Sequence, residues 1–175
     1  MRFIVIVGPK HSGKTSVGRE LASLLSGDFA DLDDLITQQN GKSPRALYIE
    51  GPEVFKKAEA EALAALFALK DKEPPLVIAS GGGLVDNPGA LALLKKNTAA
   101  ISVFLDVPAQ TAWERISKEG ELPPFLRTEN PRETHRSLHE RRAAAYRQLA
   151  SFTIKADEKA PGEIAREILR QIKDA

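Results

Sequence analysis

The residues best suited to chemistry near the start of the chain are GPKHSGKT, residues 8–15, which match the pattern GxxxxGK[ST]. Glycines allow backbone N–H groups to turn inward around phosphate oxygens, Lys14 can reach the β- and γ-phosphates, and the Thr15 hydroxyl can hold Mg²⁺. The segment lies between an apolar run and an amphipathic stretch, so the positive end of a helix should face the same anion. We therefore predict that ATP and Mg²⁺ bind at Gly8, Lys10, Ser12, Gly13, Lys14, Thr15 and Ser16.

Three carboxylates, Asp31, Asp33 and Asp34, follow a second, shorter apolar stretch. Ligands of an open parallel sheet bind beyond the carboxyl ends of its strands, which places these groups at the same edge as the phosphate loop. Phosphoryl transfer needs a metal near the β- and γ-oxygens and a group that orients the attacking hydroxyl. Two Asp residues at i and i+2 can divide those roles. The alternative interpretation is an acidic first helical turn.

A glycine triplet, Gly81, Gly82 and Gly83, directly follows Ser80 and an apolar run at Leu76–Ala79. Glycines at the end of a buried strand permit close approach of the backbone to a ligand. A flexible turn is the alternative interpretation.

A GTPase is the natural rival explanation of the phosphate loop, since it would add a DxxG and an NKxD motif after later strands. Residues 86–89, DNPG, match DxxG in letters but follow the glycine triplet instead of a strand. Residues 154–157, IKAD, lack the leading Asn. We therefore reject the GTPase interpretation.

Short apolar runs alternate with helical patterns along the chain. We expect strands at residues 3–7, 28–30, 76–79, 99–105 and 152–155. Helices are expected at residues 14–25, 34–39, from 44, and at 52–70, 87–96, 108–118, 130–149 and from 161, with a loop at 120–130. This alternation predicts an α/β fold: a three-layer sandwich around a five-stranded parallel sheet, in one domain of residues 1–175.

Composition excludes several classes of protein. The absence of cysteine excludes disulfides and thiolate chemistry, and a net charge of +1 gives no reason to expect binding to nucleic acid or a membrane. The apolar run at Phe3–Val7 is too short for a signal peptide. We expect a cytoplasmic monomer.

Together these segments resemble, in order and over nearly the whole chain, the shikimate kinase family, which has a nucleoside-monophosphate-kinase-like fold. The phosphate loop, the Asp-x-Asp pair and the glycine triplet each match a family motif. Further matches are residues 41–43, residues 51–55, and Arg142 placed four residues before Tyr146.

The resemblance implies transfer of phosphate from ATP to shikimate, a step of aromatic amino acid biosynthesis, by a P-loop kinase with a mobile lid at about residues 118–131. It implies Lys14 and Asp33 as catalytic residues, with Thr15 and Asp31 holding Mg²⁺. The implied acceptor-binding residues are Asp33, Lys56, Gly81, Gly82, Gly83 and Arg142. Arg115 would stack on adenine, Lys159 and Pro161 match the adenine-side loop, and Glu59 would orient the basic residue one turn earlier.

Two positions depart from the family pattern. Lys56 stands where the family has an arginine, and Pro123 begins PPFL where the family lid has Arg-Pro-Leu-Leu. Arg127 and Lys118 are candidates to replace the lid arginine. These departures keep open a kinase for another hydroxy acid or polyol. A nucleotide-binding module without catalysis is a further alternative, against which the intact Lys14, Thr15, Asp31 and Asp33 argue.

His135 and His139 have metal-ligand spacing, but no acidic residue of an HExxH motif lies between them, so we do not assign them a metal. The arginines around them have little aromatic interleaving and are interpreted as a solvated or phosphate-facing surface.

Overall fold

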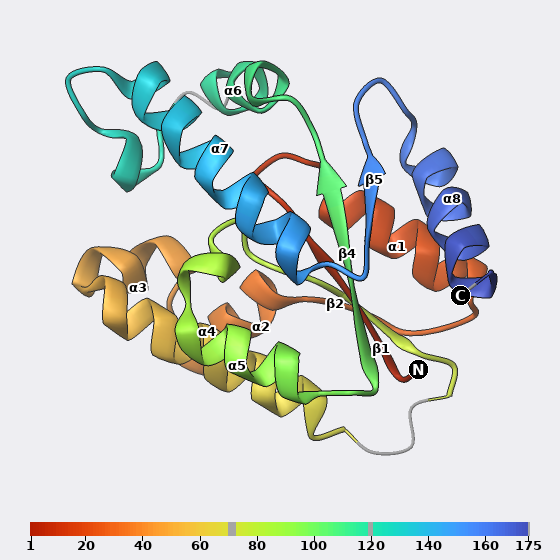
Figure 1. Ribbon diagram of the computed structural model, residues 1–175. Coiled ribbons are helices and arrows are strands. Elements are labelled where there is room, and N and C mark those ends of the chain that lie inside the picture. The colour runs from red at the N-terminus through yellow and green to blue at the C-terminus, as the bar shows by residue number, and fades with distance from the viewer. Residues whose placement is uncertain (70–72, 119–120, 175) are drawn as a thin grey trace.

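The computed structural model describes residues 1–69, 73–118 and 121–174 and shows a parallel sheet between two layers of helices (Figure 1). Five strands lie in the order β2–β3–β1–β4–β5, and every neighbouring pair is parallel. The strands are β1 (Phe3–Val7), β2 (Phe29–Asp31), β3 (Leu76–Ala79), β4 (Ala100–Asp106) and β5 (Phe152–Lys155). The predicted fold class is confirmed.

The sheet centre consists of the most apolar runs of the chain. All residues of β1 and β3 are buried, because a parallel strand covered on both faces must be apolar on both sides. The strand register aligns Ile6 with Ala79, and Ala79 with Asp31. Two residues further along, these three strands lead to Gly8, Gly81 and Asp33, so the predicted motifs leave the sheet at one level.

Two hydrophobic cores cover the two faces. On one face α1 (Lys14–Leu24) and α8 (Pro161–Lys173) pack side by side, with α6 (Ala109–Ser117) at the end of this layer. The other face is covered by α2 (Leu32–Asn40), α3 (Pro44–Glu50), α4 (Pro52–Phe67), α5 (Pro88–Lys96) and α7 (Pro131–Leu149). None of the described helices is long and apolar enough to cross a membrane.

Most boundaries agree with the sequence prediction to within one or two residues. The Asp31 side chain accepts a hydrogen bond from the Asp33 backbone and so caps α2, while Gly41 ends this helix at φ 66°. Two short 3₁₀ turns, η1 (Leu84–Asp86) and η2 (Pro124–Leu126), were not predicted, because single turns have no hydrophobic period. Residue 70, the expected end of α4, and residues 119 and 120 of the expected lid lie outside the described residues.

Asn87 joins α4 to α5 from a buried position. Its Oδ1 accepts hydrogen bonds from the Gly89 and Ala90 backbones at 3.1 and 3.2 Å, which caps α5. Its Nδ2 donates to the Lys56 carbonyl at 2.7 Å and to the Glu59 carboxylate at 2.9 Å. The Asn87 side chain therefore pairs two backbone N–H groups at the start of α5 and two buried or half-buried acceptors on α4.

We expect Asn87→Ala to lower the free energy of unfolding by about 2–4 kcal/mol, since a cap is lost and buried acceptors are left unpaired. Asn130→Ala is the matched control: Asn130 also caps a helix, but it is exposed and accepts one bond at 3.5 Å. Urea denaturation measures both variants. Equal losses in the two variants would contradict the role given to Asn87.

Candidate active site

The phosphate loop joins β1 to α1 in a conformation that its glycines make possible. Gly8 and Gly13 have φ of 150° and 91°, and His11 between them has φ of 60°. A Cβ atom on Gly8 would lie 2.8 Å from the Leu105 carbonyl oxygen, so a larger residue does not fit here. Left-handed residues of this kind turn successive N–H groups toward a common point, and α1 begins directly beyond them. The loop therefore has the geometry of an anion site.

Lys14 is buried beneath this loop. Its Nζ donates to the Pro9 carbonyl at 2.6 Å and lies 3.4 Å from the Ser12 hydroxyl. Burial lowers the pKa of Lys14 to about 8, although the carboxylates of Asp33 and Asp31 act in the opposite direction. An anionic phosphate beside this ammonium group would favour its charged form.

Thr15 and Asp31 come together at the start of α1 and the end of β2. The Thr15 hydroxyl donates to Asp31 Oδ2 at 2.8 Å. Within the described parts of the chain, no group of three or more His, Asp or Glu side chains could hold a metal alone. Mg²⁺ usually takes one or two protein oxygens and completes its shell with water and substrate phosphate oxygens. One hydroxyl and one carboxylate beside the phosphate loop fit this requirement.

Two adjoining cavities meet in front of these residues. One, of about 290 Å³, is lined by the phosphate loop together with Asp31 and Ser80. The second, of about 410 Å³, suits a small ligand. It is lined by Lys10, Asp33, Asp34, Thr37, Ser43, Pro44, Arg45, Tyr48, Phe55, Gly81, Gly82, Gly83, Pro123, Pro124, Phe125 and Arg142. Lys10, Asp33 and Gly82 line both cavities and so mark their boundary.

Close packing explains two glycines of the triplet. A Cβ atom on Gly82 would lie 2.7 Å from the Lys10 backbone nitrogen, so the triplet and the phosphate loop can touch only because Gly82 has no side chain. A Cβ atom on Gly81 would lie 3.0 Å from Glu59 Oε1 and 3.2 Å from Asp33 Oδ1. The two carboxylates therefore both face this strand end.

Asp33 has the position and charge of a group that receives a proton. Asp33 is exposed as a residue, but partial desolvation of its carboxylate, together with the neighbouring Asp31, raises the pKa of Asp33, while Lys14 lowers it. Its location on the boundary places it within reach of a ligand in either cavity. Such a carboxylate can orient a hydroxyl and accept its proton.

Glu59 is fully buried behind the second cavity, and its Oε2 accepts from Asn87 at 2.9 Å. Burial raises the pKa of Glu59 to about 7, and the charge of Asp33 acts in the same direction. The expected pairing with Lys56 is not found: Lys56 Nζ donates to Glu53 at 2.7 Å, and Lys56 is not part of the cavity lining.

Arg142 reaches the second cavity from α7 with its guanidinium already bound. Nε and Nη2 lie 2.8 and 2.7 Å from Asp86 Oδ2, and Nη1 donates to the Gly82 carbonyl at 3.2 Å. Burial alone would raise the pKa of Asp86, but Arg141 and Arg142 outweigh it and the pKa is lowered. Asp86, the first letter of the apparent DxxG motif, thus serves to hold arginines.

Of the remaining predicted residues, only Arg115 contacts the phosphate loop in the described parts of the chain. Arg115 Nη1 donates to the His11 carbonyl at 2.8 Å, so the structure brings Arg115 to the phosphate loop. Lys159 is turned to Glu167 at 2.7 Å and does not line the nucleotide cavity. The candidates to replace a lid arginine, Lys118 and Arg127, line neither of the two cavities.

Sequence reasoning missed the α3 wall of the second cavity, where Arg45 and Tyr48 line it. Their i,i+3 spacing, directly after the helix start at Ser43, was the available signal, because such residues share a helix face. No motif contains them.

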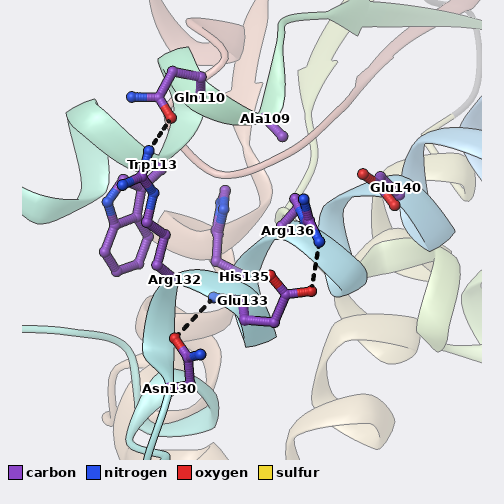
Figure 2. Close-up of a pocket in the computed structure, with 9 residues that line it drawn as sticks. All are labelled: Ala109, Gln110, Trp113, Asn130, Arg132, Glu133, His135, Arg136 and Glu140. Atoms are coloured by element: carbon purple, nitrogen blue, oxygen red, sulfur yellow. Dashed lines mark hydrogen bonds and ion pairs between the residues drawn. The ribbon is translucent and has the colours of Figure 1, made fainter.

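A further cavity, of about 570 Å³, lies between α6 and α7, and Figure 2 shows that two of its arginines are bound to neighbouring side chains of the lining. Arg132 donates to Gln110 at 2.9 Å and Arg136 to Glu133 at 2.8 Å. Trp113 packs against His135 with ring centroids 5.5 Å apart, and burial lowers the pKa of His135 to about 4. We do not place the active site there, because no described residue of the phosphate loop lines it.

Comparison with known proteins gives consistent results. A family model for shikimate kinase matches residues 10–173. A shikimate kinase of Aromatoleum aromaticum is 36% identical over 98% of this chain and 95% of its own length. A shikimate kinase of Acinetobacter baylyi is also 36% identical, over 97% of this chain and 91% of its own length. The structure of shikimate kinase from Acinetobacter baumannii in complex with shikimate has a TM-score of 0.88 to this chain. Its sequence is 32% identical, and the match covers 99% of this chain and 94% of that chain.

Glu59 gives a prediction for stability against pH. Its folded-state pKa of about 7 lies above the ordinary 4.5, so the folded chain holds a proton that the unfolded chain releases, and stability falls as pH rises from 4.5 to 7. We expect the wild type to lose on the order of 2–3 kcal/mol between pH 5 and 8 relative to Glu59→Gln. Denaturation at several pH values, with the exposed Glu61→Gln as control, measures this. Parallel profiles for wild type and Glu59→Gln would contradict it.

Proposed function

The chain belongs to the shikimate kinase family, and we propose that it transfers the γ-phosphoryl group of ATP to the 3-hydroxyl of shikimate, giving ADP and shikimate 3-phosphate. The observation that supports this most strongly is the boundary at Lys10, Asp33 and Gly82, which lines both cavities. A triphosphate in the first cavity and a small hydroxy acid in the second would meet there.

The phosphate side is explained by residues of the loop and of α1. Backbone N–H groups of residues 8–15 and the start of α1 bind the β- and γ-phosphates, and Lys14 supplies the charge beneath them. Thr15 and Asp31, whose side chains are hydrogen-bonded at 2.8 Å, would hold Mg²⁺, which would supply positive charge to offset that of the phosphates. Arg115, whose Nη1 donates to the His11 carbonyl, would stack on the adenine.

Asp33 orients the acceptor hydroxyl and takes its proton as the oxygen attacks the γ-phosphorus. The new O–P bond forms while the bond from the γ-phosphorus to the bridging oxygen breaks, and ADP leaves with that electron pair. Lys10 contributes positive charge at the boundary where the phosphoryl group passes. We assign the lid to about residues 118–131; of its described residues, Phe125 has its ring centroid 5.4 Å from Arg142 Cζ and would help to shield the second cavity from water.

The direct test is phosphorylation of a panel of hydroxy acids and polyols, with shikimate first, measured by ADP release and by mass spectrometry of the product. We expect shikimate 3-phosphate to form in a reaction that needs ATP and Mg²⁺. Lys14→Ala, purified in parallel, controls for a contaminating kinase and should be nearly inactive. Turnover of another acceptor with none of shikimate would contradict the proposal, and ATP binding without any turnover would favour a module that has lost catalysis.

Asp33→Asn separates the role in proton transfer from a role in nucleotide binding. An amide keeps the size of the side chain but cannot accept the proton, so we expect kcat to fall by roughly 10²–10⁴-fold while the Kd for ATP stays within about threefold. Steady-state kinetics and calorimetric titration with ATP measure the two quantities. A similar loss in both would assign Asp33 to nucleotide binding instead.

A further inference from the structure

The second cavity, where the acceptor is proposed to bind and which we call the acceptor cavity, is lined by one arginine that belongs to no sequence motif. Arg45 lies in the first turn of α3 and lines the cavity together with Tyr48, one turn later on the same helix. A guanidinium group can grip both oxygens of a carboxylate. The cavity therefore has two arginines, Arg45 and Arg142, that could bind an acidic acceptor.

These two arginines differ in how firmly they are held. Arg142 has its Nε and Nη2 on Asp86 and its Nη1 on the Gly82 carbonyl, and its side chain is 16% exposed. An acceptor carboxylate that took the Nε–Nη2 edge would have to displace Asp86 and leave a half-buried acid with less compensation, so Arg142 offers it only the remaining N–H groups of Nη1 and Nη2. Lys56, the other predicted carboxylate ligand, is paired with Glu53 outside the cavity lining.

Arg45 forms an exposed ion pair with Glu121, which another carboxylate can replace at little cost. Its Nη2 lies 2.9 Å from Oε2 of Glu121, and the two side chains are 39% and 68% exposed. Exposed pairs of this kind contribute little, because water solvates both partners when they separate. The other oxygen of Glu121 is bound by Arg127, so Glu121 keeps a cationic partner if Arg45 leaves it.

We propose that Arg45 is a specificity-determining residue that binds the carboxylate of the acceptor in exchange for Glu121; this assignment rests on the proposed function. Arg45 then supplies the planar fork that Lys56 lacks. Glu121 is a competitor for the same guanidinium, so its removal releases Arg45 for the acceptor. Arg45 and Glu121 thus have opposite effects on acceptor binding, which a purely structural ion pair would not show.

The experiment compares Arg45→Gln, Arg45→Lys and Glu121→Gln with wild type, measuring kcat and the KM for shikimate and for ATP. Lys42→Gln is the matched control, since Lys42 is an exposed neighbour paired with Glu50 at 2.7 Å and is not part of the cavity lining. Shikimate methyl ester, which has no charge, is the second acceptor. Thermal unfolding confirms that each variant is folded.

We expect Arg45→Gln to raise the KM for shikimate roughly ten- to a hundredfold, with the KM for ATP unchanged. Arg45→Lys should give a KM for shikimate between those of this variant and wild type, and Glu121→Gln should lower the KM for shikimate. With the methyl ester, kcat/KM should differ between wild type and Arg45→Gln by less than about threefold, because the ester has no carboxylate charge for Arg45 to bind.

If wild type phosphorylates shikimate, two results would overturn the assignment of Arg45 and leave the proposed function intact. One is an Arg45→Gln variant that behaves like Lys42→Gln; the other is a Glu121→Gln variant that shows the same loss as Arg45→Gln, which would make the pair a structural contact. A wild-type protein that leaves shikimate unphosphorylated would overturn the proposed function and this assignment with it.

Discussion

The register of three parallel strands determines where the chemistry occurs. Because β1 lies beside β3 and β3 beside β2, Ile6, Ala79 and Asp31 are aligned, and the chain leaves all three strands at one edge of the sheet. The phosphate loop, the glycine triplet and the paired Asp residues therefore converge although up to about 70 residues separate them in sequence. A shift of one residue in any strand would turn its side chains to the opposite face and separate these groups.

Desolvation shifts the pKa values of the charged groups that meet at this edge of the sheet. Lys14 is buried and close to Asp31 and Asp33, so its pKa is lowered only to about 8 and it remains largely charged near neutral pH. Desolvation raises the pKa of both Asp33 and Glu59; Asp31 adds to the effect on Asp33, and Asp33 adds to the effect on Glu59. The site thus combines a desolvated cation for phosphate with carboxylates that hold protons more readily than carboxylates in water.

The sequence predicted elements whose cause is local and missed contacts that depend on distant segments. Apolar runs of four to seven residues identify buried strands, and glycine or proline at helix ends identifies the boundaries. The partner of Glu59 could not be predicted, because Asn87 lies 28 residues away and the local alternative, Lys56, is closer in sequence. Arg45 was missed for the same reason: only the fold brings α3 to the wall of the cavity.

In the proposed reaction, phosphate passes directly from one cavity to the other across the boundary at Lys10, Asp33 and Gly82. Rapid quench of the enzyme with ATP labelled on the γ-phosphate, with and without shikimate and with Mg²⁺ present, tests it most directly. We expect that ATP alone gives neither labelled protein nor appreciable ADP, and that with shikimate the label enters the acceptor at the rate at which ADP forms. Label on the protein before it reaches the acceptor, or ADP formation that is equally fast without shikimate, would contradict it.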